Sequence, residues 1–260
     1  HTDGAAQDGL YAATLAAQAN RAVIEFYIQA SDTTGLTRTW PAPTWDTDNT
    51  FAQLANALYQ VDDASSATNM PFLRVVLTET ERVRFAGIDT GSDAEMNATF
   101  ISLDGDGTTV RYNAGIRLRG AGSRGGQPKN YRVNFASDNR WNGVSEVNLN
   151  CRYIHAQLAG SVIAQKAGLA CADARVVQMR LNGQNMATLG SVNYGSYLLV
   201  EPIGAEWAAN HFPLDPDGMM GFLERARGND QPHRPIRSRQ DGRTGATSQC
   251  LKPSDRALKI

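Results

Sequence analysis

The chain has 260 residues, of which 42% are hydrophobic and 20% are charged, and its formal net charge is −1. This composition is typical of a soluble globular protein that is long enough for one or two hydrophobic cores. The near-neutral charge gives no indication of a nucleic-acid partner, and no apolar run approaches the ~20 residues that cross a bilayer. Because the chain begins at His1 without a leader, we expect it to be a fragment or a processed chain.

Residues 1–63 predict a partial, all-β module. Segment 22–32 alternates apolar and polar residues, and segments 11–15 and 36–43 supply possible neighbouring strands. Short strands with Gly and Pro turns indicate an immunoglobulin-like sandwich of which this chain holds only a part. We expect Trp40 and Trp45 to pack against this module, with sugar binding as the alternative.

Two aspartates near the start, Asp3 and Asp8, lie among glycines. Such loops can bind Ca²⁺ through carboxylate and backbone oxygens, although the spacing is not that of an EF-hand. An ordinary polar turn is the alternative interpretation. We therefore regard both residues as weak calcium candidates, and we predict no other metal ligands.

A polar linker at 64–71 precedes a second domain, which we place at 72–212. Thr78 and Glu81 have the spacing of a capping box, so a short helix is expected to begin there. The other apolar patterns predict strands and one longer helix that is stopped by Gly168. The apolar residues of this helix, at 154, 158, 162, 163 and 169, suit one buried face. The predicted strands are 72–78, 96–103, 109–120, 131–135, 144–150, 174–183 and 196–203, and the helix is 154–169. This order predicts an α+β domain with a mainly antiparallel sheet and one packed helix.

The segment GIRLRGAGSRGGQPKNYR (115–132) carries the clearest binding signal. Its glycines let a backbone approach a ligand closely and expose N–H groups to it. Its cations suit a phosphate or another anion, and they are Arg117, Arg119, Arg124, Lys129 and Arg132. A flexible surface hairpin with solvated charges is the alternative.

Six segments in a fixed order resemble the CotH-type (spore-coat protein H) kinase family. They read IRLRG (116–120), GSR (122–124), PKNYRVNF (128–135), VNLN (147–150), VVQMRLNG (176–183) and GSYLLVEPIGAEWAANHF (195–212), with QLAGSVIAQKAGL (157–169) as the intervening helix. The resemblance covers roughly Phe72 to Phe212. It implies the small nucleotide-binding lobe of an atypical protein kinase that is extracellular or on the bacterial cell surface.

The resemblance also implies a role for particular residues. Lys129 would contact the phosphates of ATP bound with Mg²⁺ or Mn²⁺, and backbone groups near Glu201 would meet the adenine between Leu199 and Val133. An exposed strand lysine and a solvated glutamate are the alternatives. The phosphate loop would consist of Arg117, Arg119, Gly120, Gly122, Ser123 and Arg124.

The chain departs from the family pattern in two places. Gln157 lies where family helices commonly carry an acid, so the lysine–glutamate ion pair lacks its acidic partner. Segment 213–260 reads as an irregular tail or as the start of a missing catalytic lobe, and it contains no pattern of catalytic aspartates. His211 has no sequence neighbours at metal-ligand spacing.

Two functions therefore remain open. One is the nucleotide-binding part of a secreted or surface-associated kinase with a protein acceptor, whose catalytic lobe is absent from this chain. The other is a catalytically inactive structural or assembly module of a bacterial cell-surface or filament protein, with neighbouring domains or subunits as partners. Cys151 and Cys171 flank the long helix, so a disulfide and two free thiols are both possible.

Overall fold

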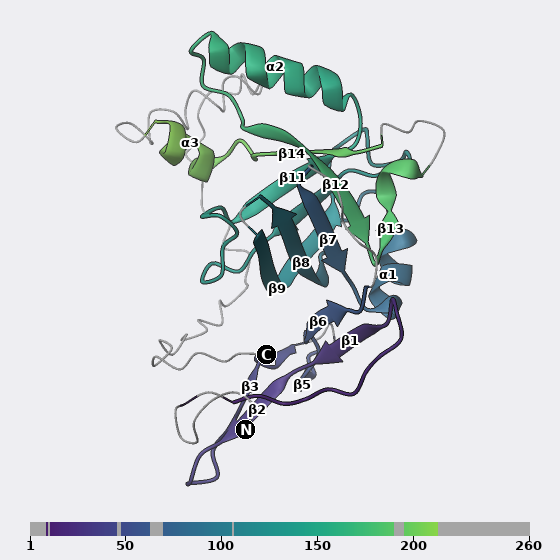
Figure 1. The fold of residues 1–260 in the computed structure, drawn as a ribbon, viewed down its shortest axis with the longest axis vertical. Helices are drawn as coiled ribbons and strands as arrows, with labels where there is room; N and C mark the ends of the chain where they lie inside the picture. The colour runs from purple at the N-terminus through teal and green to yellow at the C-terminus, as the bar shows by residue number, and fades with distance from the viewer. Residues whose placement is uncertain are drawn as a thin grey trace. The chain divides into compact units, whose positions relative to one another are not determined.

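The computed structural model describes residues 9, 11–45, 48–62, 70–105, 107–189 and 195–212. By its internal contacts the chain divides into a unit of Ala19–Gly221 and a second unit of His1–Gln18 with Phe222–Ile260. All helices and strands of the described residues lie in the first unit (Figure 1). The predicted linker 64–71 lies largely outside the described residues, and the tail 213–260 lies wholly outside them.

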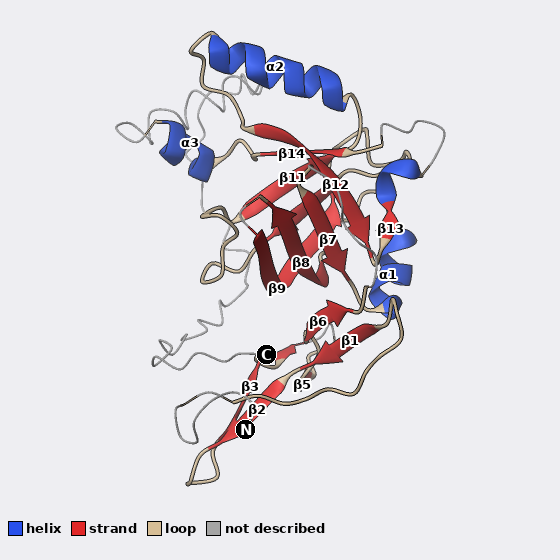
Figure 2. Cartoon of the chain, in the orientation of Figure 1, coloured by secondary structure: helices blue, strands red, loops and turns tan. Residues whose placement is uncertain are grey.

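Seven strands form a closed barrel, and strands dominate the described part of the chain (Figure 2). Neighbouring strands in the barrel are antiparallel except at the closing pair. In order around the barrel they are β7 (Phe72–Val76), β8 (Met96–Asp104), β9 (Gly107–Leu118), β10 (Tyr131–Asn134), β11 (Glu146–Asn150), β14 (Tyr197–Val200) and β12 (Ala174–Leu181). A short strand, β13 (Gln184–Asn185), forms a hairpin with the end of β12.

The barrel closes where β12 runs parallel to β7, in the register Gln178↔Phe72 to Leu181↔Val75. Asn182, the next residue, holds the two strand ends together. Its Oδ1 accepts from the Leu77 N–H at 2.8 Å, and its Nδ2 donates to the Leu77 carbonyl at 2.9 Å. Asn182 has φ +46, a left-handed conformation that asparagine tolerates better than most residues. We call this junction the closing seam.

The hydrophobic core is the interior of the barrel, to which every barrel strand contributes alternate side chains. Phe100 is fully buried and makes edge-on contacts with Phe135 and Trp141 at ring-centre distances of 5.1 and 5.5 Å. Tyr131 and Tyr197 stack at 6.1 Å near the other end of the barrel. Burial of this apolar surface is the main source of the stability of the unit.

The closed barrel contradicts the predicted fold class. We expected an open, kinase small-lobe-like sheet with one packed helix, and the structure has a closed, mostly β barrel with three α-helices. The individual strands lie close to their predicted positions. The error lies in their pairing, because β7 and β12 would be the two exposed edges of an open sheet and instead bond to each other.

The immunoglobulin-like sandwich is also contradicted. The N-terminal strands form three separate two-stranded pairs and no pair of stacked sheets. Segment 11–15 has no strand, and the predicted strand 22–32 is interrupted at Tyr27. Such short pairs bury little surface on their own. The pairs are β1 (Val23–Phe26) with β6 (Ala57–Gln60), β2 (Ile28–Ser31) with β3 (Thr37–Trp40), and β4 (Thr44–Trp45) with β5 (Phe51–Ala52).

Side chains of the barrel anchor the first of these pairs. The Leu58 N–H donates to the Thr99 hydroxyl at 3.2 Å, and the Asn113 side chain donates to the Ala55 carbonyl at 2.8 Å. Trp40 packs edge-on against Tyr112 of β9 at 5.6 Å, so this contact is with the barrel and not with the N-terminal module as expected. The N-terminal strands therefore depend on the barrel for part of their stability.

Helix α1 (Glu79–Ala86) confirms the predicted capping box. The Thr78 hydroxyl accepts from the Glu81 N–H at 3.2 Å and donates to the Glu81 carboxylate at 3.0 Å. This arrangement satisfies one of the backbone donors that every helix start leaves unpaired. Phe85 anchors α1 to the core through contact with Tyr131 at 5.7 Å.

Helix α2 (Ile154–Lys166) forms where predicted, but its burial differs from the prediction. Ile154 is the one fully buried residue of the helix, whereas Val162 and Ile163 are 39% and 67% exposed. The helix packs against β12 and β14 with one side only. The third helix is α3 (Ala205–His211), and no helix in the described ranges has the length and apolar character to cross a membrane.

Candidate functional site

Two glycines of the loop between β9 and β10 lie close to other side chains of the chain. Gly120 has φ +112, and a Cβ there would lie 2.3 Å from the Ser123 hydroxyl. A Cβ on Gly126 would lie 1.5 Å from the Arg152 guanidinium, so this arginine lies directly against the loop backbone. Gly122 has open space around it. Packing explains two of these glycines without a ligand.

Two of the predicted phosphate-binding arginines are ion-paired. Arg124 and Arg117 both bond to the Asp93 carboxylate, and Arg117 also lies 3.6 Å from Glu95. The pKa of Asp93 is lowered, mainly by the hydrogen bond from Arg124. Arg124 further donates to the Gly120 and Ser92 carbonyls at 2.6 and 3.0 Å. These side chains hold the loop in place and are largely neutralised.

Arg119 has a neutral partner. Its guanidinium donates to Asn150 Oδ1 at 2.8 Å, and the Asn150 amide donates to Gln157 Oε1 at 2.7 Å. Burial, together with the nearby charge of Arg132, lowers the pKa of Arg119. Gln157, which occupies the position of the expected acid, bonds to Asn150 and to the Arg152 carbonyl. The hydrogen bonds from Arg119 to Asn150 and from Asn150 to Gln157 thus connect the loop region to the start of α2.

Lys129 also bonds within the loop. Its Nζ donates to the Arg124 carbonyl at 2.6 Å, and its own carbonyl accepts from the Tyr197 hydroxyl at 2.9 Å. The cavity beside Lys129 has a volume of about 130 Å³ and is lined mainly by apolar residues. That volume is below the ~300–1,000 Å³ of typical ligand pockets. The remaining predicted loop residue, Ser123, accepts from the Asn130 amide at 3.1 Å.

Glu201 lies beyond the opposite end of β14 from the loop. Tyr197, at the start of β14, contacts Lys129, and the four residue steps from Tyr197 to Glu201 span roughly 13 Å along a strand. Leu199 lines a hollow near Glu201, whereas Val133 is fully buried inside the barrel. Both side chains also belong to the buried core of the barrel, so the two expected apolar walls of the adenine pocket are packed core residues.

The hollow at Glu201 has a volume of about 670 Å³ and contains a convergent set of polar side chains. Ligand atoms of Asp173, Glu201 and His211 all lie within 4.8 Å of one another. The backbone fixes the first two, because the Glu201 N–H donates to the Asp173 carbonyl at 2.9 Å and the Asp173 N–H donates to Glu201 Oε2 at 3.3 Å. The Gln165 amide donates to Asp173 Oδ1 at 2.8 Å.

His211 reaches this set from the last turn of α3. Its Nδ1 lies 3.0 Å from the Trp207 carbonyl, and its Nε2 lies 3.8 Å from Glu201 Oε2. The imidazole stacks on the Trp207 ring at 4.8 Å. Sequence analysis missed this arrangement because the three residues are 28 and 10 positions apart, without a motif. His211 has no sequence neighbours at metal-ligand spacing, but the fold brings Asp173 and Glu201 close to it in space.

The wall of a neighbouring hollow contains an unusual donor. Trp207 is 4% exposed, and within the described part of the chain its indole Nε1 has no hydrogen-bond partner. Trp207 and Glu201 both line this second hollow, whose volume is about 260 Å³. A buried, unpaired indole N–H is uncommon, because burial without a partner costs free energy.

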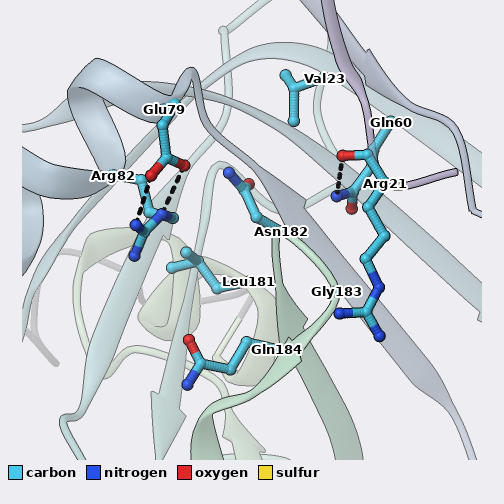
Figure 3. A pocket seen from close by; sticks show the side chains of 9 residues that line it. All are labelled: Arg21, Val23, Gln60, Glu79, Arg82, Leu181, Asn182, Gly183 and Gln184. Carbon is cyan, nitrogen blue, oxygen red and sulfur yellow. Dashed lines mark hydrogen bonds and ion pairs between the residues drawn. The ribbon is translucent and has the colours of Figure 1, made fainter. Parts of the chain in front are cut away.

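A further hollow, of about 550 Å³, lies beside the closing seam (Figure 3). Two of its three charged residues are paired, since Arg82 donates to both oxygens of Glu79. The Gln60 amide donates to the Arg21 carbonyl at 3.2 Å, and Asn182 is engaged with Leu77. This hollow therefore offers few side chains with unused binding capacity.

Cys151 and Cys171 are free thiols in the structure, so the possible disulfide between them is not formed. The Cys151 thiol is buried and contacts the Pro128 carbonyl at 3.1 Å, and burial raises its pKa to about 11. Cys171 contacts the Ser161 carbonyl at 3.4 Å. The calcium candidates Asp3 and Asp8 lie outside the described residues.

Comparison with known proteins leaves the family open. Neither a scan against protein-family models nor a search of curated proteins gives a match to this chain. The CotH-type resemblance therefore remains a prediction from the motifs.

Proposed function

We propose that the described part of this chain is a non-catalytic assembly module of a larger bacterial surface protein, and that α2 is its docking surface. The observation that carries the proposal is the exposed apolar side of α2. We call this the outer face of α2, formed by Ala156, Ala159, Val162 and Ile163, all of them exposed.

Helix α2 has apolar residues on both sides, and its exposed residues also include His155, Gln165 and Lys166. Its inner side, with Ile154 and Leu158, faces the barrel, and it has no acidic residue and only one lysine, Lys166. Surface helices normally carry charged residues on the side away from the core, and helices that are apolar all round are normally buried. The surface of a second copy of this chain, as a neighbouring subunit, would complete the burial of α2.

The state of the loop cations favours this proposal over nucleotide binding. Arg117 and Arg124 share Asp93, and Lys129 bonds to a loop carbonyl. A phosphate would have to displace these contacts, and breaking them would cost part of its binding free energy. Kinase activity and ATP binding therefore remain predictions from the resemblance alone.

Replacing Ile163 by glutamate is expected to reduce self-association of the chain. Ile163 is 67% exposed on the outer face, and a charge there opposes the burial of that face against another molecule. Light scattering coupled to size-exclusion chromatography, over a range of concentrations, would measure the effect. The wild-type chain should show a mass that rises with concentration, and the variant should remain monomeric.

Val83→Glu provides the matched control. Val83 is 58% exposed on α1, away from the outer face, so this variant should associate as the wild type does. A wild-type chain that is monodisperse at all concentrations would contradict the proposal. If Ile163→Glu and Val83→Glu reduced self-association equally, the result would also contradict the proposal, because a general effect of added charge would then explain it.

Titration with ATP in the presence of Mg²⁺ or Mn²⁺ is expected to give no saturable binding. The reason is the engagement of the loop cations within the chain. Calorimetry on the wild type, Lys129→Ala and, as a control, Lys166→Ala would decide this. Saturable binding that is lost in Lys129→Ala and kept in Lys166→Ala would support nucleotide binding instead.

A further inference from the structure

The side chains of Asp173, Glu201 and His211 reach one point from three different elements. Asp173 immediately precedes β12, Glu201 immediately follows β14, and His211 ends α3. Their ligand atoms lie within 4.8 Å of one another at the hollow of about 670 Å³. A cation at this point would link the two strand ends to α3.

The histidine is oriented as metal-binding histidines usually are. A backbone carbonyl can only accept a hydrogen bond, so Nδ1 of His211 must be the donor in its contact with Trp207. In the neutral imidazole, Nε2 then carries the lone pair, and this atom is the one that lies 3.8 Å from Glu201. Hydrogen bonding of the second ring nitrogen to a carbonyl is the common outer-shell arrangement of histidine ligands.

The carboxylates are held in a similar way. Gln165, from α2, donates to Asp173 Oδ1, and the Asp173 N–H donates to Glu201 Oε2. These contacts limit the motion of both side chains before any cation binds. Trp207, whose ring stacks on His211, has a buried Nε1 without a partner within the described ranges, and it lines the neighbouring hollow together with Glu201.

We propose that Asp173, Glu201 and His211 bind a divalent transition-metal ion, with Zn²⁺ as the best-fitting probe. One imidazole and two carboxylates suit Zn²⁺ or Mn²⁺, whereas Ca²⁺ prefers six to eight oxygen ligands. Three protein ligands leave a fourth tetrahedral position, which opens to the hollow and can hold water or an oxygen ligand. The bound ion links α3, through His211, to the barrel strand ends at Asp173 and Glu201. This inference is independent of the proposed assembly role of α2.

Zinc titration of the full chain, after treatment with a chelator, tests the site. Calorimetry should show a class of binding that becomes at least about tenfold weaker in Asp173→Asn, Glu201→Gln and His211→Ala, since each variant removes one of three ligands. His155→Ala is the matched control, because His155 is an exposed histidine of α2 outside the hollow, and it should bind as the wild type does.

Thermal unfolding provides a second measurement, which does not depend on how tightly zinc binds at other sites of the chain. Zinc should raise the midpoint of the wild type and of His155→Ala, and should leave the midpoints of the three site variants unchanged. In chelator, the site variants should unfold near the wild-type midpoint, which shows that they fold. Zinc binding and stabilisation that persist in His211→Ala, or that are absent from the wild type, would overturn the proposal.

Discussion

Replacing Asn182 by alanine is expected to lower the free energy of unfolding by about 2–5 kcal/mol, because it leaves two buried backbone groups unpaired. The Leu77 N–H and carbonyl bond to the Asn182 side chain at 2.8 and 2.9 Å, and Leu77 is fully buried. Water cannot easily replace these two bonds. Chemical denaturation followed by circular dichroism would measure the loss.

Asn142→Ala is the matched control for backbone strain. Asn142 has φ +48, almost the same as the φ +46 of Asn182, and its side chain is exposed. Alanine in this conformation costs about 1–2 kcal/mol by itself. The difference between the two variants therefore isolates the hydrogen bonds at the closing seam. Equal losses would mean that the side chain of Asn182 does not stabilise the seam.

Replacing Phe100 by alanine is expected to cost about 3–5 kcal/mol of unfolding free energy. Phe100 is fully buried and contacts Phe135 and Trp141, so its truncation leaves a cavity and removes two aromatic contacts. Trp141 also lines the hollow at Glu201, and its indole N–H donates to the Ser102 hydroxyl at 2.8 Å. Denaturation should show the loss of stability, and tryptophan fluorescence should report the altered packing.

Phe51→Ala is the control for this substitution. Phe51 is 55% exposed and contacts Trp45 in a two-stranded pair, so its truncation should cost less than about 1 kcal/mol. A cost for Phe100→Ala that is no larger than this would contradict the position of Phe100 at the centre of the core. Zinc binding by Phe100→Ala at low temperature would show whether the hollow at Glu201 keeps its structure when the side chain of Phe100 is removed.

Local sequence signals predicted the elements of the barrel well. The Thr78–Glu81 spacing placed α1, and alternation of apolar residues placed β7 to β12 near their observed positions. These signals depend on neighbouring residues, whose effects act over a few positions of the chain. The predicted pairing of Thr78 with Glu81 is confirmed, because the Thr78 hydroxyl accepts from the Glu81 N–H and donates to the Glu81 carboxylate.

Long-range pairing was not predictable in the same way. The residues that close the barrel, such as Leu181 and Val75, have the same apolar alternation as any other strand residues, and nothing in the pattern identifies the partner. The convergence of Asp173, Glu201 and His211 follows from that pairing and from the position of α3. Sequence periodicity also assigned Val162 and Ile163 of α2 to a buried face, but both are exposed. The pattern of an apolar helix does not show which of its sides packs against the rest of the chain.

The closing seam has a consequence for the order of events during folding. Pairing of β7 with β12 must wait until residues about 100 positions downstream of β7 have been synthesised. Until then β7 presents an unsatisfied strand edge, which is a template for intermolecular pairing. Contacts between such distant residues slow folding and prolong the exposure of partly folded chains. Nascent chains that end before Leu181 should therefore aggregate more than chains that include β12.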